Sequence, residues 1–145
     1  MIRLLRDRRA DAYAWFAVLM VLVGLPLSSL SIDVTRLMYV RGHLHTANDA
    51  ACQAAADALD VPLYISTGQA RINPGLARSQ AGAVFVSALQ DAGQVGYGPN
   101  LSVGFPGPTF AHCIATASVA HIIPMTPPMD VTVETTSEMR VRTLR

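Results

Sequence analysis

The pattern of hydrophobic and polar positions changes twice along the 145-residue chain, and the first stretch is the most apolar. Residues 12–32 contain no aspartate, glutamate, lysine, arginine or histidine. A helix of about twenty apolar residues spans about 30 Å, which is the thickness of the hydrocarbon core of a bilayer. The pattern therefore predicts a transmembrane helix over residues 12–32.

The residues before this helix, 1–11, form a basic segment and predict its orientation. Basic residues next to a membrane helix favour the cytoplasmic side, so we expect the N-terminus inside and the rest of the chain outside the cytoplasm. A cleaved secretory signal also begins with basic residues, but its apolar core is usually shorter, at about 7–15 residues. The longer run favours an uncleaved anchor and leaves the signal, or a buried helix of a soluble protein, as alternatives. The orienting residues are Arg3, Arg6, Arg8 and Arg9.

Residues 33–60 keep a helical pattern beyond the predicted span. Their apolar positions recur at alternating steps of three and four, which is the spacing of a heptad seam. The seam predicts an alanine-rich stem helix that packs against its own head, against sister subunits, or against both. Asp33 and Arg36 lie three residues apart and can pair where the helix leaves the membrane on its extracytoplasmic side. The seam consists of Leu37, Val40, Leu44, Ala47, Ala51, Ala54 and Ala58.

The remainder predicts a small α/β head at residues 74–145, after a turn-rich link at 61–73. Asn73 followed by Pro74 is typical of a helix start, and this helix should run to about Ala92. Residues 110–123 and 129–142 alternate with period two around a proline-rich turn, which predicts an antiparallel hairpin. A further strand or loop is expected at 95–105, where glycine and proline interrupt the pattern. The fold class is therefore α+β with a long N-terminal helix.

Composition and motifs indicate no enzyme. The chain has 51% hydrophobic and 14% charged residues and a net charge of +1, which gives no basic surface for nucleic acid. His43 and His45 should point to opposite sides of the stem, so they cannot chelate one ion. No phosphate loop or nucleophile motif is present. We therefore expect no catalytic residue, metal site, cofactor or small-molecule substrate.

Two cysteines, Cys52 on the stem and Cys113 on a predicted strand, would both lie outside the cytoplasm, where disulfides persist. A bond between them would link the hairpin to the stem. Two buried free thiols, which behave as small hydrophobic groups, are the alternative. The compartment favours the disulfide.

The segments "IDVTRLMYV" and "LHTANDAACQAAADAL", with an arginine doublet before the apolar run and Pro26 within it, are similar to those of TadE/TadG-like proteins of the tight-adherence (Flp) pilus systems. TadE-type members often have a glycine and a glutamate where Ala10 and Trp15 stand here, so the chain resembles the TadG-like branch more closely. The resemblance implies a non-enzymatic minor pilin or pilus-assembly component of the bacterial inner membrane, with other pilus subunits as partners through the N-terminal helix. The alternative is a membrane-tethered ligand-binding or sensory domain.

Overall fold

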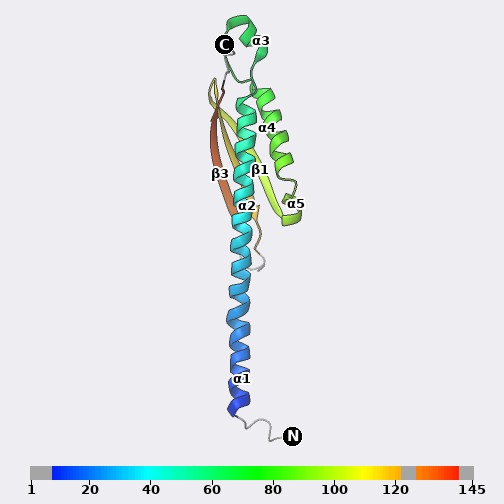
Figure 1. Ribbon diagram of the computed structural model, residues 1–145, viewed down its shortest axis with the longest axis vertical. Coiled ribbons are helices and arrows are strands. Elements are labelled where there is room, and N and C mark those ends of the chain that lie inside the picture. The colour runs from blue at the N-terminus through cyan, green and yellow to red at the C-terminus, as the bar shows by residue number, and fades with distance from the viewer. Residues whose placement is uncertain (1–7, 122–126, 141–145) are drawn as a thin grey trace. The chain divides into compact units, whose positions relative to one another are not determined.

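A computed structural model of the protein describes residues 8–121 and 127–140. The chain divides into two compact units, Met1–Arg36 and Leu37–Arg145. Helix α2 (Leu25–Ala56) contributes to both. The predicted fold class is confirmed, because a long N-terminal helix is followed by shorter helices and a three-stranded antiparallel sheet (Figure 1).

The first unit is helical from α1 (Arg8–Leu19) through a π-helical turn, η2 (Met20–Gly24), into the start of α2. The wider turn lies just before Pro26. Proline has no N–H to donate and its ring clashes with the carbonyl four residues earlier, so a normal α-helical turn is disfavoured at this point. The interruption expected from Pro26 is thus accommodated within a helix that continues.

The sheet of the second unit has the order β1 (Tyr97–Gly107), β2 (Phe110–Val119), β3 (Met129–Glu138), and both pairs are antiparallel. The predicted hairpin is β2 with β3, in which Cys113 lies opposite Thr135. The strand expected near residues 95–105 is β1, an edge strand that accommodates Pro99 and Pro106 because one side of it needs no ladder bonds. Residues 122–126, which cover the start of the expected proline turn, lie outside the described residues.

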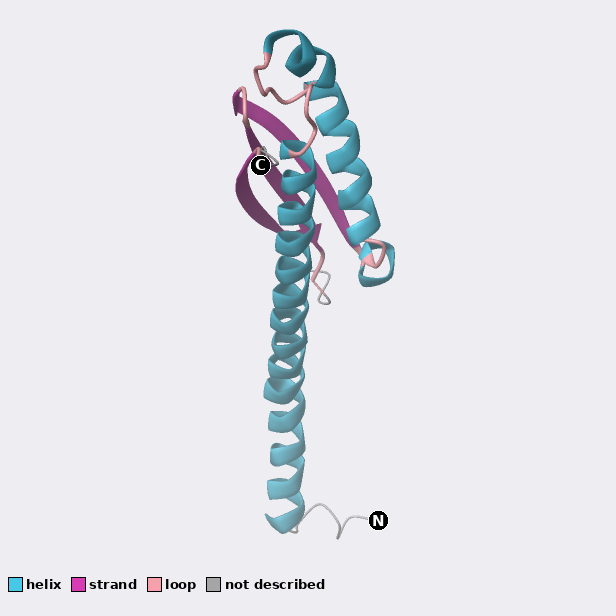
Figure 2. Cartoon of the chain, turned by 45° about the horizontal axis from the view of Figure 1, so that its top comes forward, coloured by secondary structure: helices cyan, strands magenta, loops and turns pink. Residues whose placement is uncertain are grey.

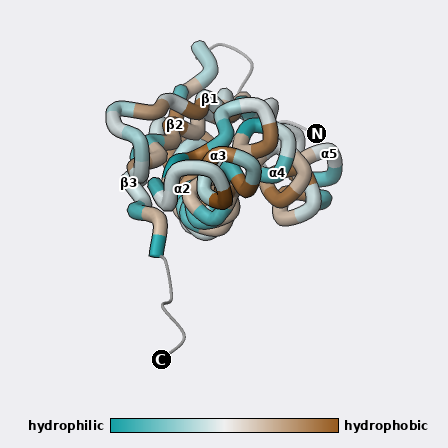
Figure 3. Tube along the Cα trace, turned by 90° about the horizontal axis from the view of Figure 1, so that it is seen from above, coloured by the Kyte–Doolittle hydropathy of each residue, from teal (hydrophilic) through white to brown (hydrophobic). Residues whose placement is uncertain are grey.

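Two helices, the second half of α2 and α4 (Pro74–Ala88), lie on one face of the sheet (Figures 2 and 3). Strand β2 alternates between buried and more exposed residues, and its buried positions include Ala111, Cys113 and Ala115. Because α2 also presents alanines here, helix and sheet can approach closely. The core therefore consists largely of small side chains, with Val40, Leu44 and Phe85 as larger members.

Three expected boundaries differ from the structure. Residues 61–73 are not entirely a link, because they contain α3 (Val61–Thr67), whose N-terminus is capped by the Asp60 side chain and whose C-terminus ends at Gly68 with φ 70°. The stem helix ends at Ala56 rather than near residue 60. Helix α4 ends at Ala88, before α5 (Ala92–Val95), and not at about Ala92. The predicted cap is correct: Asn73 accepts hydrogen bonds from the N–H groups of Gly75 and Leu76.

The head also begins earlier than predicted. Its compact unit starts at Leu37, so the second half of α2 is part of the head and not a stem that precedes it. The physical reason is that the small residues of this half pack against the sheet, whose central strand β2 also buries mainly small residues.

Candidate functional site

Among the described residues, exposed large hydrophobic side chains are concentrated in the helical segment 12–32. Trp15 is 73% exposed and Leu22 is 69% exposed, and the large hydrophobic side chains around them are exposed in the same way. Within the described residues, one helical stretch, Ala12–Ala56, is long and apolar enough to cross a membrane, and its most apolar window has a mean hydropathy of 2.1. By length and composition the segment fits a single membrane span or a signal anchor.

The residues expected to orient this helix are only partly described. Arg8 and Arg9 begin α1, whereas Arg3 and Arg6 lie outside the described residues. Asp33 and Arg36 follow the apolar segment on α2; Asp33 is largely buried and Arg36 is half-buried.

The predicted seam is located in the core of its own chain. Five of its positions are buried and Leu37 and Ala54 are half-buried; all but Ala58, which follows the end of the helix, lie on the side of α2 that faces the head. The seam was expected to meet the head, sister subunits or both, and the head fills it. As an assembly surface the seam prediction therefore needs correction, because these side chains are already covered. The buried positions are Val40, Leu44, Ala47, Ala51 and Ala58.

The opposite side of α2 is the exposed stripe, which we define as Met38, Arg41, Gly42, His45 and Thr46. These residues line a shallow surface hollow, and Met38 is 71% exposed. The exposed stripe was not predicted from sequence, although it occupies the helical positions between those of the seam. A helical projection alone would have identified it.

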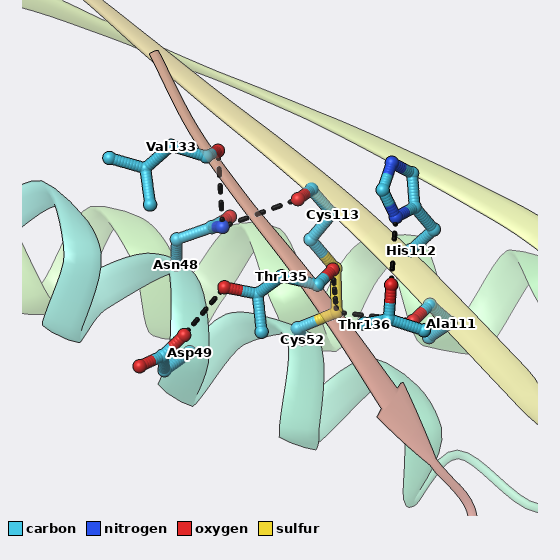
Figure 4. Close-up of a disulfide and its surroundings, with 9 residues drawn as sticks. All are labelled: Asn48, Asp49, Cys52, Ala111, His112, Cys113, Val133, Thr135 and Thr136. Atoms are coloured by element: carbon cyan, nitrogen blue, oxygen red, sulfur yellow. Dashed lines mark hydrogen bonds between the residues drawn. A yellow bond between two sulfur atoms is a disulfide. The ribbon is translucent and has the colours of Figure 1, made fainter. Parts of the chain in front are cut away.

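Cys52 and Cys113 form a disulfide that joins α2 to the central strand β2, with 5.6 Å between their Cα atoms (Figure 4). The bond predicted from sequence is thus present in the structure. The Cys52 sulfur also lies 3.4 Å from the carbonyl oxygens of Ala111 and Thr135. A bonded sulfur carries no proton, so these are packing contacts. After reduction the thiol could donate to either carbonyl.

Polar side chains of α2 next to the disulfide also bind the sheet. The buried Asn48 side chain donates from Nδ2 to the carbonyl oxygens of Cys113 and Val133, at 3.2 and 3.4 Å. At the next residue of α2, the Asp49 carboxylate accepts a hydrogen bond from the Thr135 hydroxyl at 2.6 Å. The second Asp49 carboxylate oxygen lies 2.9 Å from Nδ1 of His45. The helix is therefore fixed to β2 and β3 by a covalent bond and by directional hydrogen bonds.

A second polar group surrounds Asp91, just before α5. Its carboxylate accepts hydrogen bonds from the hydroxyls of Tyr39 at 2.6 Å and Tyr97 at 3.1 Å, and Nδ1 of His43 lies 3.8 Å away. The hydrogen bond from Tyr39 lowers the pKa of Asp91, and the same bond raises the pKa of Tyr39. Burial and then the Asp91 hydrogen bond raise the pKa of Tyr97 to about 12. The group links α2 to the connection between α4 and β1.

The two histidines of α2 have different acidic neighbours. His43 lies beside Asp91 and His45 beside Asp49, so each has a different neighbour. In the part of the chain that the structure describes, no cluster of three or more histidine, cysteine or acidic side chains could hold a metal ion.

A surface hollow of about 590 Å³ lies between the link before α4 and the turn between β1 and β2. Arg71, Ile72, Phe105 and Pro108 are among its lining residues. The guanidinium of the nearby Arg78 lies 5.7 Å from the centre of the Phe105 ring, within the range of a cation–π contact. The hollow thus combines an apolar floor with one cationic side chain.

Comparison of the chain with known protein families, with characterised proteins and with solved structures gives no match.

Proposed function

We propose that the protein is a non-enzymatic minor pilin or pilus-assembly component of a Tad/Flp-type pilus, anchored in the bacterial inner membrane with its head outside the cytoplasm. The observation that carries the proposal is the charge-free segment 12–32, whose side chains are exposed on all sides of the helix. Such a surface requires lipid or other apolar helices around it. A filament built around N-terminal helices would supply the second environment.

Several features of the head support this proposal. Its disulfide fits an oxidising compartment outside the cytoplasm. The polar side chains of Asp49 and Asp91 bind other parts of the same head. The resemblance of residues 8–60 to TadE/TadG-like proteins agrees with such an architecture.

Because the seam is buried in the head, assembly in this proposal uses the segment 12–32 and the exposed stripe. A substitution in the seam, such as Leu44→Asp, would unfold the head and so could not report on assembly. Variants on exposed positions are required.

The test is to shear surface filaments from native cells and to quantify the protein by mass spectrometry in the sheared and membrane fractions. We expect the protein in the sheared fraction at a lower amount than the major pilin. The N-terminal peptide from the same samples shows whether the chain is processed near Ala10. Recovery from membranes alone, with Met1 intact, would contradict incorporation into the filament.

A matched pair of variants localises the contact. Met38 in the exposed stripe and Val86 on α4 are both 71% exposed, so aspartate at either position leaves the core intact. We expect Met38→Asp to reduce recovery in the sheared fraction and Val86→Asp to leave it unchanged. Equal recovery of both variants would exclude the exposed stripe as the assembly surface.

The second candidate, a membrane-tethered binding domain, is favoured by the hollow beside Phe105. Its apolar floor and Arg71 would suit a small anionic ligand with an apolar part. Ligand binding that is lost in Phe105→Ala, together with absence from sheared filaments, would favour this function over the first.

A further inference from the structure

The two edges of the sheet differ in how well they are protected. The edge strand β1 contains Pro99, Pro106, Gly98 and Gly104, and it contacts α4 and α5. The edge strand β3 has ten residues without proline, glycine or lysine, and β-branched residues are frequent in it. Natural proteins usually protect a long edge strand with proline, with lysine or with a covering helix, because the free main-chain groups of the strand can pair with another chain.

The main-chain groups on the outer side of β3 remain available. In a ladder only every second residue turns its N–H and C=O toward a given neighbour, so the other residues of β3 point away from β2. Among the described residues, the backbone-to-backbone hydrogen bonds of β3 are formed with β2 alone, and side chains of α2 contact two of its carbonyl oxygens, those of Val133 and Thr135. The edge can therefore accept a further strand.

Space beside the edge is also present. A polar hollow of about 440 Å³ is lined by Gln53 of α2, by Asp57 just after α2, by residues of β3 that include Thr136 and Glu138, and by Arg140. The hollow follows the last residues of β3. An extended segment could enter this hollow without displacing any of the elements that the structure describes.

The charge of the strand indicates the kind of partner. Asp130, Glu134 and Glu138 recur at every fourth residue, all are exposed, and β3 carries no basic residue. In a central antiparallel pairing of two β3 strands, Glu134 would lie opposite its own copy and Asp130 opposite Glu138. Like charges on opposed residues destabilise a sheet, whereas opposite charges stabilise it.

We propose that β3 is a docking edge for an extended basic segment of a partner protein, which adds to the sheet as a fourth strand. Main-chain hydrogen bonds would supply the pairing, and lysine or arginine at every fourth residue would contact the three acidic side chains. This inference concerns a surface that does not include the segment 12–32, so it holds or fails independently of incorporation into a filament.

The first experiment uses the full chain in detergent micelles and two synthetic peptides, KVTVKVTVK and EVTVEVTVE. We expect the basic peptide to bind on the order of tenfold more tightly, because three opposite-charge pairs replace three like-charge pairs. Hydrogen exchange of the segment 129–138 should slow when the basic peptide is bound. Absence of binding, or binding without slower exchange in this segment, would overturn the proposal.

Two methylated forms of the basic peptide test for strand addition directly. One form is N-methylated at even positions and the other at odd positions. A strand pairs through the N–H groups of one parity only, so one form should lose binding and the other should keep it. If both forms bind as well as the parent peptide, the contact is electrostatic and the proposal fails.

Matched variants locate the charge contact. The pair Glu134→Gln with Glu138→Gln raises the net charge by the same amount as Gln80→Lys with Gln90→Lys, and all four positions are exposed. We expect only the first pair to weaken binding of the basic peptide. Equal weakening by both pairs would indicate long-range electrostatic attraction and would overturn the proposal. If cross-links instead formed between the β3 strands of two copies of the chain, and the basic peptide did not reduce them, the occupant of the edge would be a second copy.

Discussion

The two halves of α2 are both rich in hydrophobic residues, yet their environments are opposite. Leu27 in the first half is 58% exposed, whereas Leu44 in the second half is completely buried. The first half carries no charged residue before Asp33 and exposes its leucines, whereas the second half is apolar along one buried stripe and polar elsewhere. The comparison teaches that the angular distribution of hydrophobic residues, and not their number, distinguishes a helix that fits lipid from one that fits a protein core.

Several polar side chains of α2 also differ between the two halves in where their hydrogen bonds end. In the first half, the Ser28 hydroxyl donates to the carbonyl of Gly24 at 2.8 Å, and Thr35 donates to Ser31 at 2.9 Å. These hydroxyls are satisfied within their own helix and need no partner. In the second half, Asn48 instead reaches carbonyls of two strands. A polar side chain that bonds to a carbonyl of its own helix is therefore compatible with a membrane. One that bonds to a carbonyl of another element fixes the helix to that element.

The largest loss of stability should come from removing the disulfide that joins the second half of α2 to β2. The disulfide closes a loop with a sequence separation of 61, and the chain-entropy relation gives a loss of about 4 kcal/mol in the free energy of unfolding of the head. Pulse proteolysis in urea, on the protein in detergent, would measure the loss in Cys52→Ala with Cys113→Ala. Membrane association of this variant should be unchanged, and a head of unaltered stability would contradict the prediction.

The same substitution in each half tests the comparison directly. Leu44→Ala should lower the free energy of unfolding of the head by about 2–5 kcal/mol, because it leaves a cavity in the core. Leu27→Ala should change it by less than about 0.5 kcal/mol, since this side chain is exposed. Urea midpoints for the two variants provide the measurement. Similar losses at the two positions would show that both halves are packed against the head.

Asn48 allows a finer test of the polar contacts. Asn48→Ala should cost about 1–3 kcal/mol of unfolding free energy through the two lost hydrogen bonds. Its side-chain oxygen has no partner among the described residues, so a value at the lower end is expected. Asn100→Ala, at an exposed position on β1, is the control and should have almost no effect. A cost equal to that of the control would remove Asn48 from the contacts that fix α2.

The smallest effect concerns pH. The raised pKa of Tyr97 means that its neutral form is favoured in the folded head, so its contribution to stability is complete below the ordinary phenol pKa of about 10. It should be lost as the pH rises through about 12. Tyr97→Phe should therefore reduce the fall in Tm between these pH values, as measured by thermal melts with Tyr64→Phe as control. If the fall in Tm at alkaline pH were the same in Tyr97→Phe as in the unchanged protein, the raised pKa would not belong to Tyr97.

The lowered pKa of Asp91 acts at the other end of the pH scale. A carboxyl group with a depressed pKa contributes stability above its unfolded value, and the contribution is lost as the pH falls through the folded value. Asp91→Asn should thus make the acid limb of the Tm profile shallower. The alkaline limb reports on Tyr97 and Tyr39, whose pKa values are both raised, so the two limbs separate the carboxylate from its tyrosine partners.

Local signals in the sequence were sufficient for several elements. The heptad spacing from Leu37 onward predicts a buried stripe, and Asn73 with Pro74 predicts the start of α4 correctly. The same kind of signal, Asp60 with Pro62 and a closing Gly68, marks α3, which was nevertheless expected to be a link. A capping side chain followed by proline therefore marks the start of α3 as well as the start of α4.

Other features depend on contacts between distant residues and could not be derived from local pattern. A seam shows that a helix needs a partner, but it does not show whether the partner is the same chain. Tyr39 and Asp91 are separated by 52 positions, and their hydrogen bond follows only from the packing of the head. The protected and open edges of the sheet likewise become visible only when the strand order is known.

The disulfide also has a mechanical consequence. A tensile load applied along α2 would pass through the Cys52–Cys113 bond directly into β2, which is the strand with a neighbour on each side. The hydrogen bonds on both sides of β2 would then share that load, so the helix could not be peeled away from the sheet one contact at a time. Breaking the connection by force would require rupture of a covalent bond or simultaneous shear of two ladders.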